Sequence, residues 1–351
     1  MSITSFYFLA LVTVGVLVYY VVPKSIQWMI LLVLSAVFYY FAATPCTIGY
    51  LVVSTMIAYL STMWIQKKRD ALGREAKGLL VVTFVALAVN IAIWFFVKGR
   101  GLWVPFALRL TAWRDVSVLD SLVNWKIAAS LGMGYYTLQV MGYIIDCYWE
   151  NITPQKNPLK LFLFVCYFPQ LTTGPISRYT QLNTLYSPHR FEYRNLAFGS
   201  QRILWGFMKK IVLAERVGMI VSAINADPGT YTGFYSWIAI LLYPLQMYAD
   251  FSGCMDIVLG VSELFGIPLA ENFNNPFFSR SSQEFWQRWH ITLGTWAKDY
   301  VLYPLLKSKS MVNFGKVARK KYGKKTGKFL VNLVGMFMLW MIMGIWHGGW
   351  R

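Results

Sequence analysis

Long apolar runs, separated by short polar and basic gaps, fill most of the 351-residue chain. A helix needs about 20 apolar residues to cross a bilayer, because each residue rises about 1.5 Å. The runs therefore predict an all-α polytopic membrane protein of about eight to ten membrane helices, with re-entrant or interfacial segments. The run Leu159–Gln170 is too short to cross alone. The predicted helices are Ser5–Val22, Trp28–Ala43, Cys46–Ile65, Gly78–Val97, Lys126–Trp149, Leu159–Gln170, Leu196–Ile224, Tyr235–Phe265, Ser282–Leu306 and Phe329–His347.

Composition supports a membrane location and argues against nucleic acid as a partner. Hydrophobic residues make up 57% of the chain and charged residues 14%, compared with roughly 25% charged in soluble domains. The net charge is +18, but the basic residues fall mostly in the gaps, where they indicate topology and contact with anionic headgroups. No positive segment precedes the first apolar run, so we expect no cleaved signal peptide. The four widely spaced cysteines predict apolar packing residues, with no metal site or disulfide framework.

Basic gaps give an orientation. The stretch Lys307–Lys328 carries nine basic residues and no acidic one, and Gln66–Lys77 carries five basic residues. The positive-inside rule places both in the cytoplasm and the N-terminus outside, although the basic segment Lys98–Arg114 conflicts with this topology. Gly323–Lys328 lacks the spacing of a phosphate-binding loop. We predict a solvated loop over Lys307–Lys328 that contacts anionic lipid, and docking of an acidic carrier protein there remains an alternative.

The stretch Ser282–Leu306 is amphipathic when it is drawn as one helix. Polar residues share one arc, and aromatic and aliphatic residues fill the other side together with His290. This pattern predicts an interfacial helix with His290 on its buried side. Either hydrogen-bonded packing or chemistry would account for His290. The arc of polar residues is Glu284, Arg288, Thr292, Thr295, Lys298 and Asp299.

His347 ends the last apolar run, about 18 residues and roughly 27 Å from the basic stretch. A polar side chain at that depth needs a partner or a wet cavity. Gly344, Gly348 and Gly349 surround it and permit a helix break or the close approach of a substrate. These features favour a functional role for His347 over packing. Asn332 lies on a similar face of the same run, but it is too far away to bond to His347.

Two other segments stand out. Phe168–Arg178 interrupts the helical pattern with two prolines and a glycine; it predicts either the wall of an active-site tunnel or an ordinary turn outside the membrane. Asp250 and Asp256 are acids within a long apolar run. Each needs a partner or water, and we predict a structural polar network for them.

Several of these motifs together resemble the membrane-bound O-acyltransferase family. The segments Ala270–Arg280, Glu284–Leu293 and Lys298–Tyr300 look like its signature. Trp346–Gly348, Phe168–Arg178 and Tyr248–Asp256 are similar to its bacterial polysaccharide branch, which includes alginate O-acetyltransferases and teichoic-acid D-alanyltransferases. The matches follow the family order across nearly the whole chain.

The resemblance implies one domain over residues 1–351, with helices around a central tunnel in the bacterial cytoplasmic (inner) membrane. It implies that His347 is the catalytic histidine and His290 the second signature histidine. Relatives continue with further helices after the His347 motif, so we expect this chain to lack them. The other residues assigned to substrate or tunnel are Trp346, Trp289, Arg288, Asp299, Asn274, Gln170, Pro175 and Arg178.

The resemblance also implies a reaction and its partners. Neutral His347 would act as general base on a hydroxyl that attacks a cytoplasmic acyl thioester, and His290 would orient the donor or polarise its carbonyl. The donor is an acyl-CoA or an acylated carrier protein, with no tightly bound cofactor and no metal. The acyl group would be acetyl, passed to an extracytoplasmic polysaccharide or to an esterase-like relay protein. The alternatives are D-alanyl transfer to teichoic acid, a lipid or polysaccharide flippase, and an inactive membrane scaffold.

Overall fold

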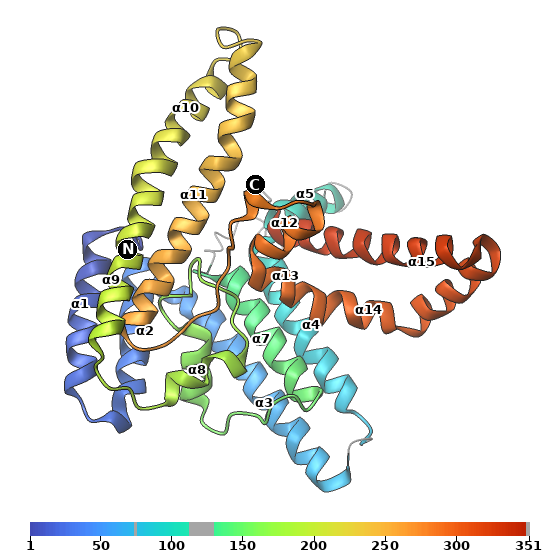
Figure 1. Cartoon of the computed structure of the whole chain (residues 1–351). Helices are drawn as coiled ribbons and strands as arrows, with labels where there is room; N and C mark the ends of the chain where they lie inside the picture. The colour runs from blue at the N-terminus through green and yellow to red at the C-terminus, as the bar shows by residue number, and fades with distance from the viewer. Residues whose placement is uncertain (74–75, 112–129, 349–351) are drawn as a thin grey trace.

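The computed structural model describes residues 1–73, 76–111 and 130–348, and these residues form helices joined by turns and loops (Figure 1). The predicted segment Lys126–Trp149 lies partly outside the described residues, as do Arg114 of the segment Lys98–Arg114 and Gly349 after His347. The helices are α1 Phe6–Val21, α2 Gln27–Ala42, α3 Ile48–Leu72, α4 Leu79–Lys98, α5 Arg100–Thr111, α7 Met133–Tyr148, α8 Pro158–Cys166, α9 Tyr193–Phe207, α10 Glu215–Ala226, α11 Phe234–Leu264, α12 Ser282–Arg288, α13 Ile291–Ala297, α14 Tyr303–Lys307 and α15 Lys309–His347.

Shorter 3-10 and π-helical segments join or extend these helices. The π-helical segments η4 and η6 each continue an α-helix, η4 after α9 and η6 after α13. The bounds of these segments are η1 Lys24–Ile26, η2 Pro45–Thr47, η3 Tyr179–Tyr186, η4 Met208–Ala214, η5 Pro276–Phe278 and η6 Lys298–Leu302.

The body of the molecule consists of the N-terminal helices together with α7 and α8 (Figure 1). Its core is rich in aromatic side chains, including Tyr19, Phe38 and Phe168, which are fully or almost fully buried. The end of α3 that is predicted to lie on the cytoplasmic side is fixed by Arg69. Its guanidinium donates to the carbonyls of Cys147 (3.1 Å) and Tyr148 (2.7 Å). This anchoring accounts for the continuation of α3 to Leu72, beyond the predicted end at Ile65.

Four segments are long and apolar enough to cross a membrane: Lys24–Ala42, Pro45–Leu72, Leu79–Lys98 and Lys309–His347. Helix α1 is apolar but has only 16 residues. The described residues thus hold fewer full-length candidates than the predicted eight to ten. The main reason is that several predicted runs are divided into shorter or kinked helices.

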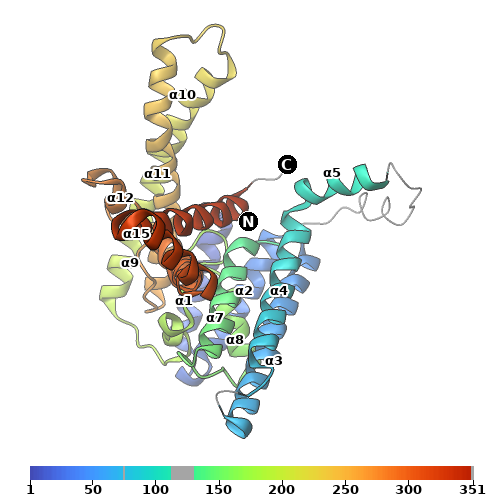
Figure 2. The same cartoon turned by 90° about the vertical axis from the view of Figure 1, so that its right-hand side faces the viewer.

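Helices α9 and α11 pack at backbone contact. A Cβ atom placed on Gly206 would lie 2.7 Å from the carbonyl oxygen of Gly253 and 2.8 Å from the amide nitrogen of Ile257, and one on Gly199 would lie 2.8 Å from the carbonyl oxygen of Gly260. Small residues allow this approach, as in many membrane helix pairs. Beyond the contact, α10 and the first half of α11 project together from the body (Figures 1 and 2).

We expect Gly206→Ala to lower the free energy of unfolding by about 1–3 kcal/mol, because the new methyl group must push two backbones apart. Thermal or denaturant unfolding in detergent measures this change. Gly49→Ala on α3 is the control, since a Cβ there meets nothing within 4 Å and alanine ordinarily favours a helix by about 1 kcal/mol over glycine. Equal stabilisation by both substitutions would contradict backbone contact at Gly206.

The C-terminal part differs from the prediction in two ways. The segment Ser282–Leu306 is not one helix, because Trp289 is extended and His290 is left-handed (φ 45°, ψ 54°) between α12 and α13. The basic stretch Lys307–Lys328 is not a loop but is largely helical. It forms the outer part of a hairpin in which α15 turns back at Gly323 (φ 82°), as Figures 1 and 2 show.

The segment Lys98–Arg114 also folds differently from the expected interhelical gap. Its described part forms helix α5, which contains Pro105 in its interior. Two basic residues of this segment, Lys98 and Arg100, sit at the junction of α4 and α5. Up to Thr111, the segment therefore continues the helical structure after α4.

Candidate functional site

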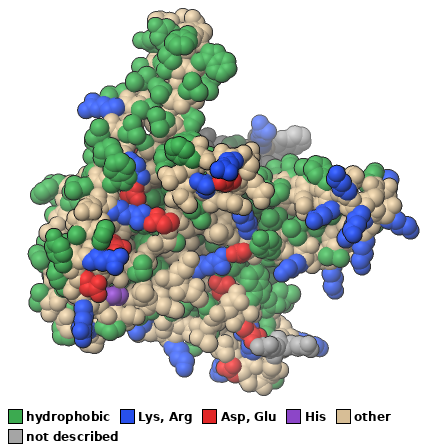
Figure 3. Space-filling model, in the orientation of Figure 1, with side chains coloured by type: hydrophobic (Ala, Val, Ile, Leu, Met, Phe, Trp, Pro, Cys, Tyr) green, Lys and Arg blue, Asp and Glu red, His purple; other side chains and the backbone are tan. Residues whose placement is uncertain are grey.

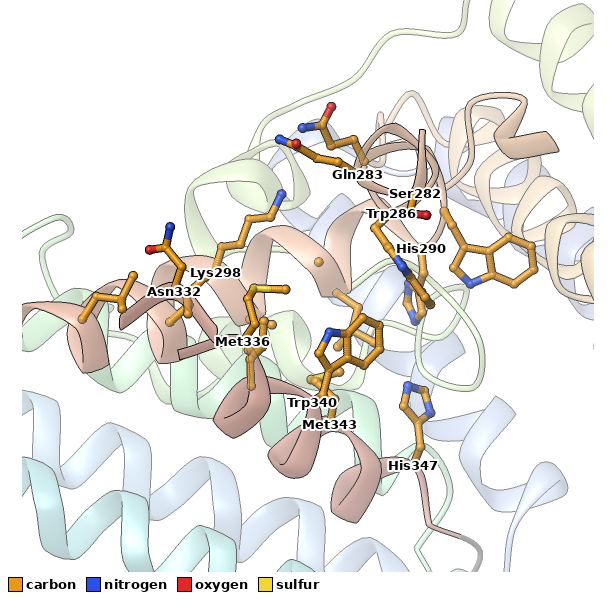
Figure 4. A pocket seen from close by; sticks show the side chains of 18 of the residues that line it. Ser282, Gln283, Trp286, His290, Lys298, Asn332, Met336, Trp340, Met343 and His347 are labelled. Carbon is orange, nitrogen blue, oxygen red and sulfur yellow. The ribbon is translucent and has the colours of Figure 1, made fainter. Parts of the chain in front are cut away.

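A cavity of about 810 Å³ lies between α11, the α12–α13–η6 segment and the second arm of α15. Its walls are mainly apolar, with Met336, Trp340 and Met343 on the α15 side (Figure 4). The two histidines His290 and His347 both line it, and Figure 4 shows their rings directed toward one another from different elements. A cavity that is apolar apart from a few convergent polar groups is typical of a site for an organic substrate.

His290 owes its position to a strained backbone. Its left-handed conformation is uncommon for a residue other than glycine and occurs often at functional sites. An antiparallel bridge between Phe273 and Trp289 holds the chain on either side. Two backbone bonds of 3.0 Å complete it, from Asn274 N–H to the Arg288 carbonyl and from Ile291 N–H to the Asn272 carbonyl. The bridge turns the His290 side chain inward.

The His290 ring is 6% exposed and lies against the edge of Phe251, with 4.9 Å between ring centroids. Its Nδ1 is 3.1 Å from Oδ1 of Asn272. Burial, and to a smaller extent the nearby His347, lower the pKa of His290 to about 3. The imidazole is therefore neutral at pH 7.

His347 is the last residue of α15, and its side chain is open to the cavity. Its ring meets the ring of Trp346 edge to face at 4.5 Å. Trp346 packs against the ring of Tyr135 on α7. The Trp346 ring and the ammonium group of Lys98 both lie next to Gly134. Asn332, four turns earlier on α15, lines the same cavity, as expected from its predicted face.

The structure brings together only some of the residues assigned from the sequence. Trp289, His290 and His347 line the cavity, and Trp346 supports His347. Arg288 instead pairs with Glu284 (2.6 Å) on the outer side of α12. Asn274 is exposed and borders a separate polar pocket beside α9 and α11.

The turn Phe168–Arg178 packs behind α13 and does not line the cavity. Gln170 and Pro175 are buried in the body. Arg178 forms an ion pair with Asp299 of η6, and its guanidinium lies over the ring of Tyr300 at 5.4 Å. The turn thus supports the segment that carries His290 from behind, and its assignment to the wall of a tunnel stays a prediction.

The acids Asp250 and Asp256 form the polar network predicted for them. Lys210 on η4 donates to Asp250 (2.6 Å), and Arg202 on α9 donates to Asp256 (3.0 Å). Lys209 also pairs with Asp256. This network joins α9 and η4 to α11 on the side of Asn272 away from the cavity.

Sequence reasoning missed two residues at the site. Asn272 belongs to a segment quoted above for its family resemblance, but an asparagine before a turn usually indicates turn chemistry only. Lys98 appeared only as a topology signal. Neither residue could be assigned without knowing which segments lie beside His290 and Trp346.

Positive charge gathers on the α15 hairpin, where Figure 3 shows blue side chains along the projecting arm. Its second helical arm runs from the basic turn to His347, so that one element connects the charged tip with the cavity. Among the described residues, no group of three or more His, Cys, Asp or Glu side chains is arranged to hold a metal ion. Cys147, Cys166 and Cys254 are buried and belong to the main hydrophobic core, as predicted, whereas Cys46 is exposed.

Comparison with known proteins agrees with the motifs. Residues 153–319 match the model of the membrane-bound O-acyltransferase family; this range includes His290, and His347 lies beyond it. A Pseudomonas putida protein named "Probable alginate O-acetylase AlgI" is 28% identical over 337 residues, which are 95% of this chain and 66% of that protein.

Two further relatives carry different names. The peptidoglycan O-acetyltransferase of Helicobacter pylori is 30% identical over 63% of this chain and 44% of its own length. The teichoic acid D-alanyltransferase of Streptococcus thermophilus is 27% identical over 77% of this chain and 70% of its own length. The chain thus spans less than two thirds of the length of the alginate and peptidoglycan relatives. By its domain match, the chain contains a membrane-bound O-acyltransferase family domain over residues 153–319, and its relatives are proteins named for acyl transfer.

Proposed function

We propose that this protein is an O-acyltransferase that moves an acyl group, most readily acetyl, from a thioester to a hydroxyl group. The observation that carries the proposal is the pair of histidines, His290 and His347, facing one cavity from two elements. The family domain and the relatives named for acetyl and D-alanyl transfer support the same reaction class.

In the proposed reaction, His347 acts as general base. Its neutral imidazole takes the proton of the acceptor hydroxyl as the oxygen forms a bond to the thioester carbonyl carbon. The tetrahedral intermediate then collapses, the carbon–sulfur bond breaks, and the imidazolium returns the proton to the leaving thiolate. The products are an ester and a free thiol, and the enzyme ends in its starting protonation state.

The substrates enter the proposal by their chemistry. The donor is an acyl-CoA or an acylated carrier protein, both of which are anionic and would be attracted to the basic α15 hairpin. The acceptor is a hydroxyl of an extracytoplasmic polysaccharide or of an esterase-like relay protein, with D-alanyl transfer to teichoic acid as the alternative. The protein would act in the bacterial cytoplasmic membrane with its N-terminus outside.

Thioester turnover by purified protein in detergent tests the reaction class. We expect slow release of free thiol from acetyl-CoA or from an acylated carrier protein, because water can replace the acceptor hydroxyl in an open cavity. A thiol-reactive dye measures the release, and boiled protein is the blank. Movement of a lipid-linked substrate across proteoliposomes without any thiol release would favour a flippase and contradict the proposal.

A further inference from the structure

The amide oxygen of Asn272 lies at the centre of a buried hydrogen-bond cluster behind His290. Three donors converge on Oδ1: the backbone N–H of Thr292 at 3.0 Å, the hydroxyl of Thr292 at 2.9 Å and Nδ1 of His290 at 3.1 Å. Asn272 is 1% exposed and its amide nitrogen approaches the sulfur of Met255 at 3.3 Å. The amide is therefore held on both sides.

Two neighbours determine which end of the amide is the oxygen. A backbone N–H can only donate, so the atom that faces the amide of Thr292 must be an acceptor. The hydroxyl of Thr292 is oriented in turn, because it accepts the backbone N–H of Ile176 at 3.0 Å and so directs its own proton to Asn272. The oxygen of Asn272 thus faces this cluster.

The proton on the His290 ring follows from the same logic. An amide oxygen carries no hydrogen, so a hydrogen bond to Nδ1 of His290 requires that Nδ1 carries the proton. A neutral imidazole then has its lone pair on Nε2, the ring nitrogen remote from Asn272. Across the described residues, Nε2 has no hydrogen-bond partner, and the ring lines the cavity opposite His347.

We propose that Asn272 is a positioning residue that fixes His290 as its Nδ1–H tautomer, so that His290 presents a hydrogen-bond acceptor, and not a donor, to the cavity. This deepens the proposed function and rests on it for the role in catalysis. His290 would accept a hydrogen bond from another donor on a bound substrate, such as a second hydroxyl or an amide N–H, because the single proton of the attacking hydroxyl goes to His347. It would not polarise the thioester carbonyl, since that role needs a proton on Nε2.

Other charged groups near His290 would act on it from two directions. His347 on α15 and Lys298 on η6 line the same cavity. Behind Asn272 lie two carboxylates and two cations that are paired with one another: Asp256, Glu271, Arg202 and Lys209. The pKa of His290 must therefore be compared between variants that leave all of these charged groups unchanged.

Asn272→Asp is the informative substitution, because a carboxylate keeps acceptors for all three donors. The new charge beside Nδ1–H would favour the imidazolium and raise the pKa of His290. The titration midpoint of the His290 imidazole should then move to higher pH by at least about 1 pH unit. Asn183→Asp is the matched control, since Asn183 is exposed on η3 and its replacement should leave the His290 midpoint unchanged.

A direct readout of the tautomer does not depend on activity. The chain has three histidines, so ¹⁵N-histidine labelling gives three imidazole signal sets, which His189→Gln and His347→Asn assign. We expect the protonated Nδ1 signature for His290 in the unchanged protein, with titration at higher pH in Asn272→Asp. In Asn272→Leu, the preference for this tautomer should disappear if the protein folds.

The outcomes separate the two proposals. A protonated Nε2 in the unchanged protein, or equal titration of His290 in Asn272→Asp and Asn183→Asp, would overturn the role of Asn272. The Nδ1–H tautomer in a protein that shows no acyl transfer would support the inference on His290 and contradict the proposed function. A higher His290 midpoint in Asn272→Asp alone, in a protein that transfers acyl groups, would support both.

Discussion

His347→Asn should lower acyl transfer by about 10²–10⁴-fold, the usual contribution of a general base. Asparagine retains a polar side chain but cannot take up the hydroxyl proton at neutral pH. His347 ends its helix with an open side chain, so we expect little effect on folding. The measurement is transfer of a labelled acetyl group, with protein amount determined in the same membranes.

His189→Gln is the matched control for this substitution. The His189 ring bonds the hydroxyl of Tyr19 at 2.8 Å, away from the cavity, so its loss should leave the transfer rate within about twofold when normalised to folded protein. Full activity of His347→Asn would refute the assignment of the base. An equal loss in both variants would indicate a general effect on folding.

Helices in the body could be predicted closely from the apolar runs. The predicted Ser5–Val22 and Gly78–Val97 each differ from α1 and α4 by one residue at either end. These helices need only a continuous apolar pattern, because the bilayer leaves few alternatives to helical hydrogen bonding. The basic stretch was wrongly predicted as a loop, because its charge was given more weight than its helix propensity. Lys and Arg are good helix formers, and only the kink at Gly323 separates the arms of the hairpin.

The break at His290 could not be predicted from local sequence. The residues on both sides continue a helical pattern, and the break arises from pairing of Trp289 with Phe273, sixteen residues earlier. Such a non-local bridge leaves no periodic signal. The helical wheel consequently placed Thr292 on the polar face, whereas Thr292 is 6% exposed and binds Asn272. The buried side of His290 was nevertheless predicted, because the wheel placed His290 among aromatic and aliphatic residues.

The need for partners of Asp250 and Asp256 could be predicted, but not the identity of those partners. An acid in an apolar run must be paired or hydrated, and this requirement holds for any fold. The bases that meet the requirement lie at least 40 residues earlier, on α9 and η4. Close glycine contacts between α9 and α11 bring the two sides together.

The largest loss of stability should come from Asp256→Ala. Asp256 is 14% exposed and pairs with Lys209, which is 12% exposed, and with Arg202. Removing the carboxylate leaves the Lys209 ammonium buried without its counter-charge, and such a change typically costs about 3–5 kcal/mol. Unfolding in detergent, followed by denaturant or heat, measures the loss.

Glu271→Gln provides the contrast within the same network. Glu271 binds Arg202 through two bonds of 2.6 and 2.7 Å, but it is 58% exposed, so its loss should cost less than about 1 kcal/mol. The double variant Lys209→Met with Asp256→Leu should recover most of the stability lost in Asp256→Ala, because it removes the stranded charge together with its partner. Equal losses in Asp256→Ala and Glu271→Gln would show that burial does not govern this network.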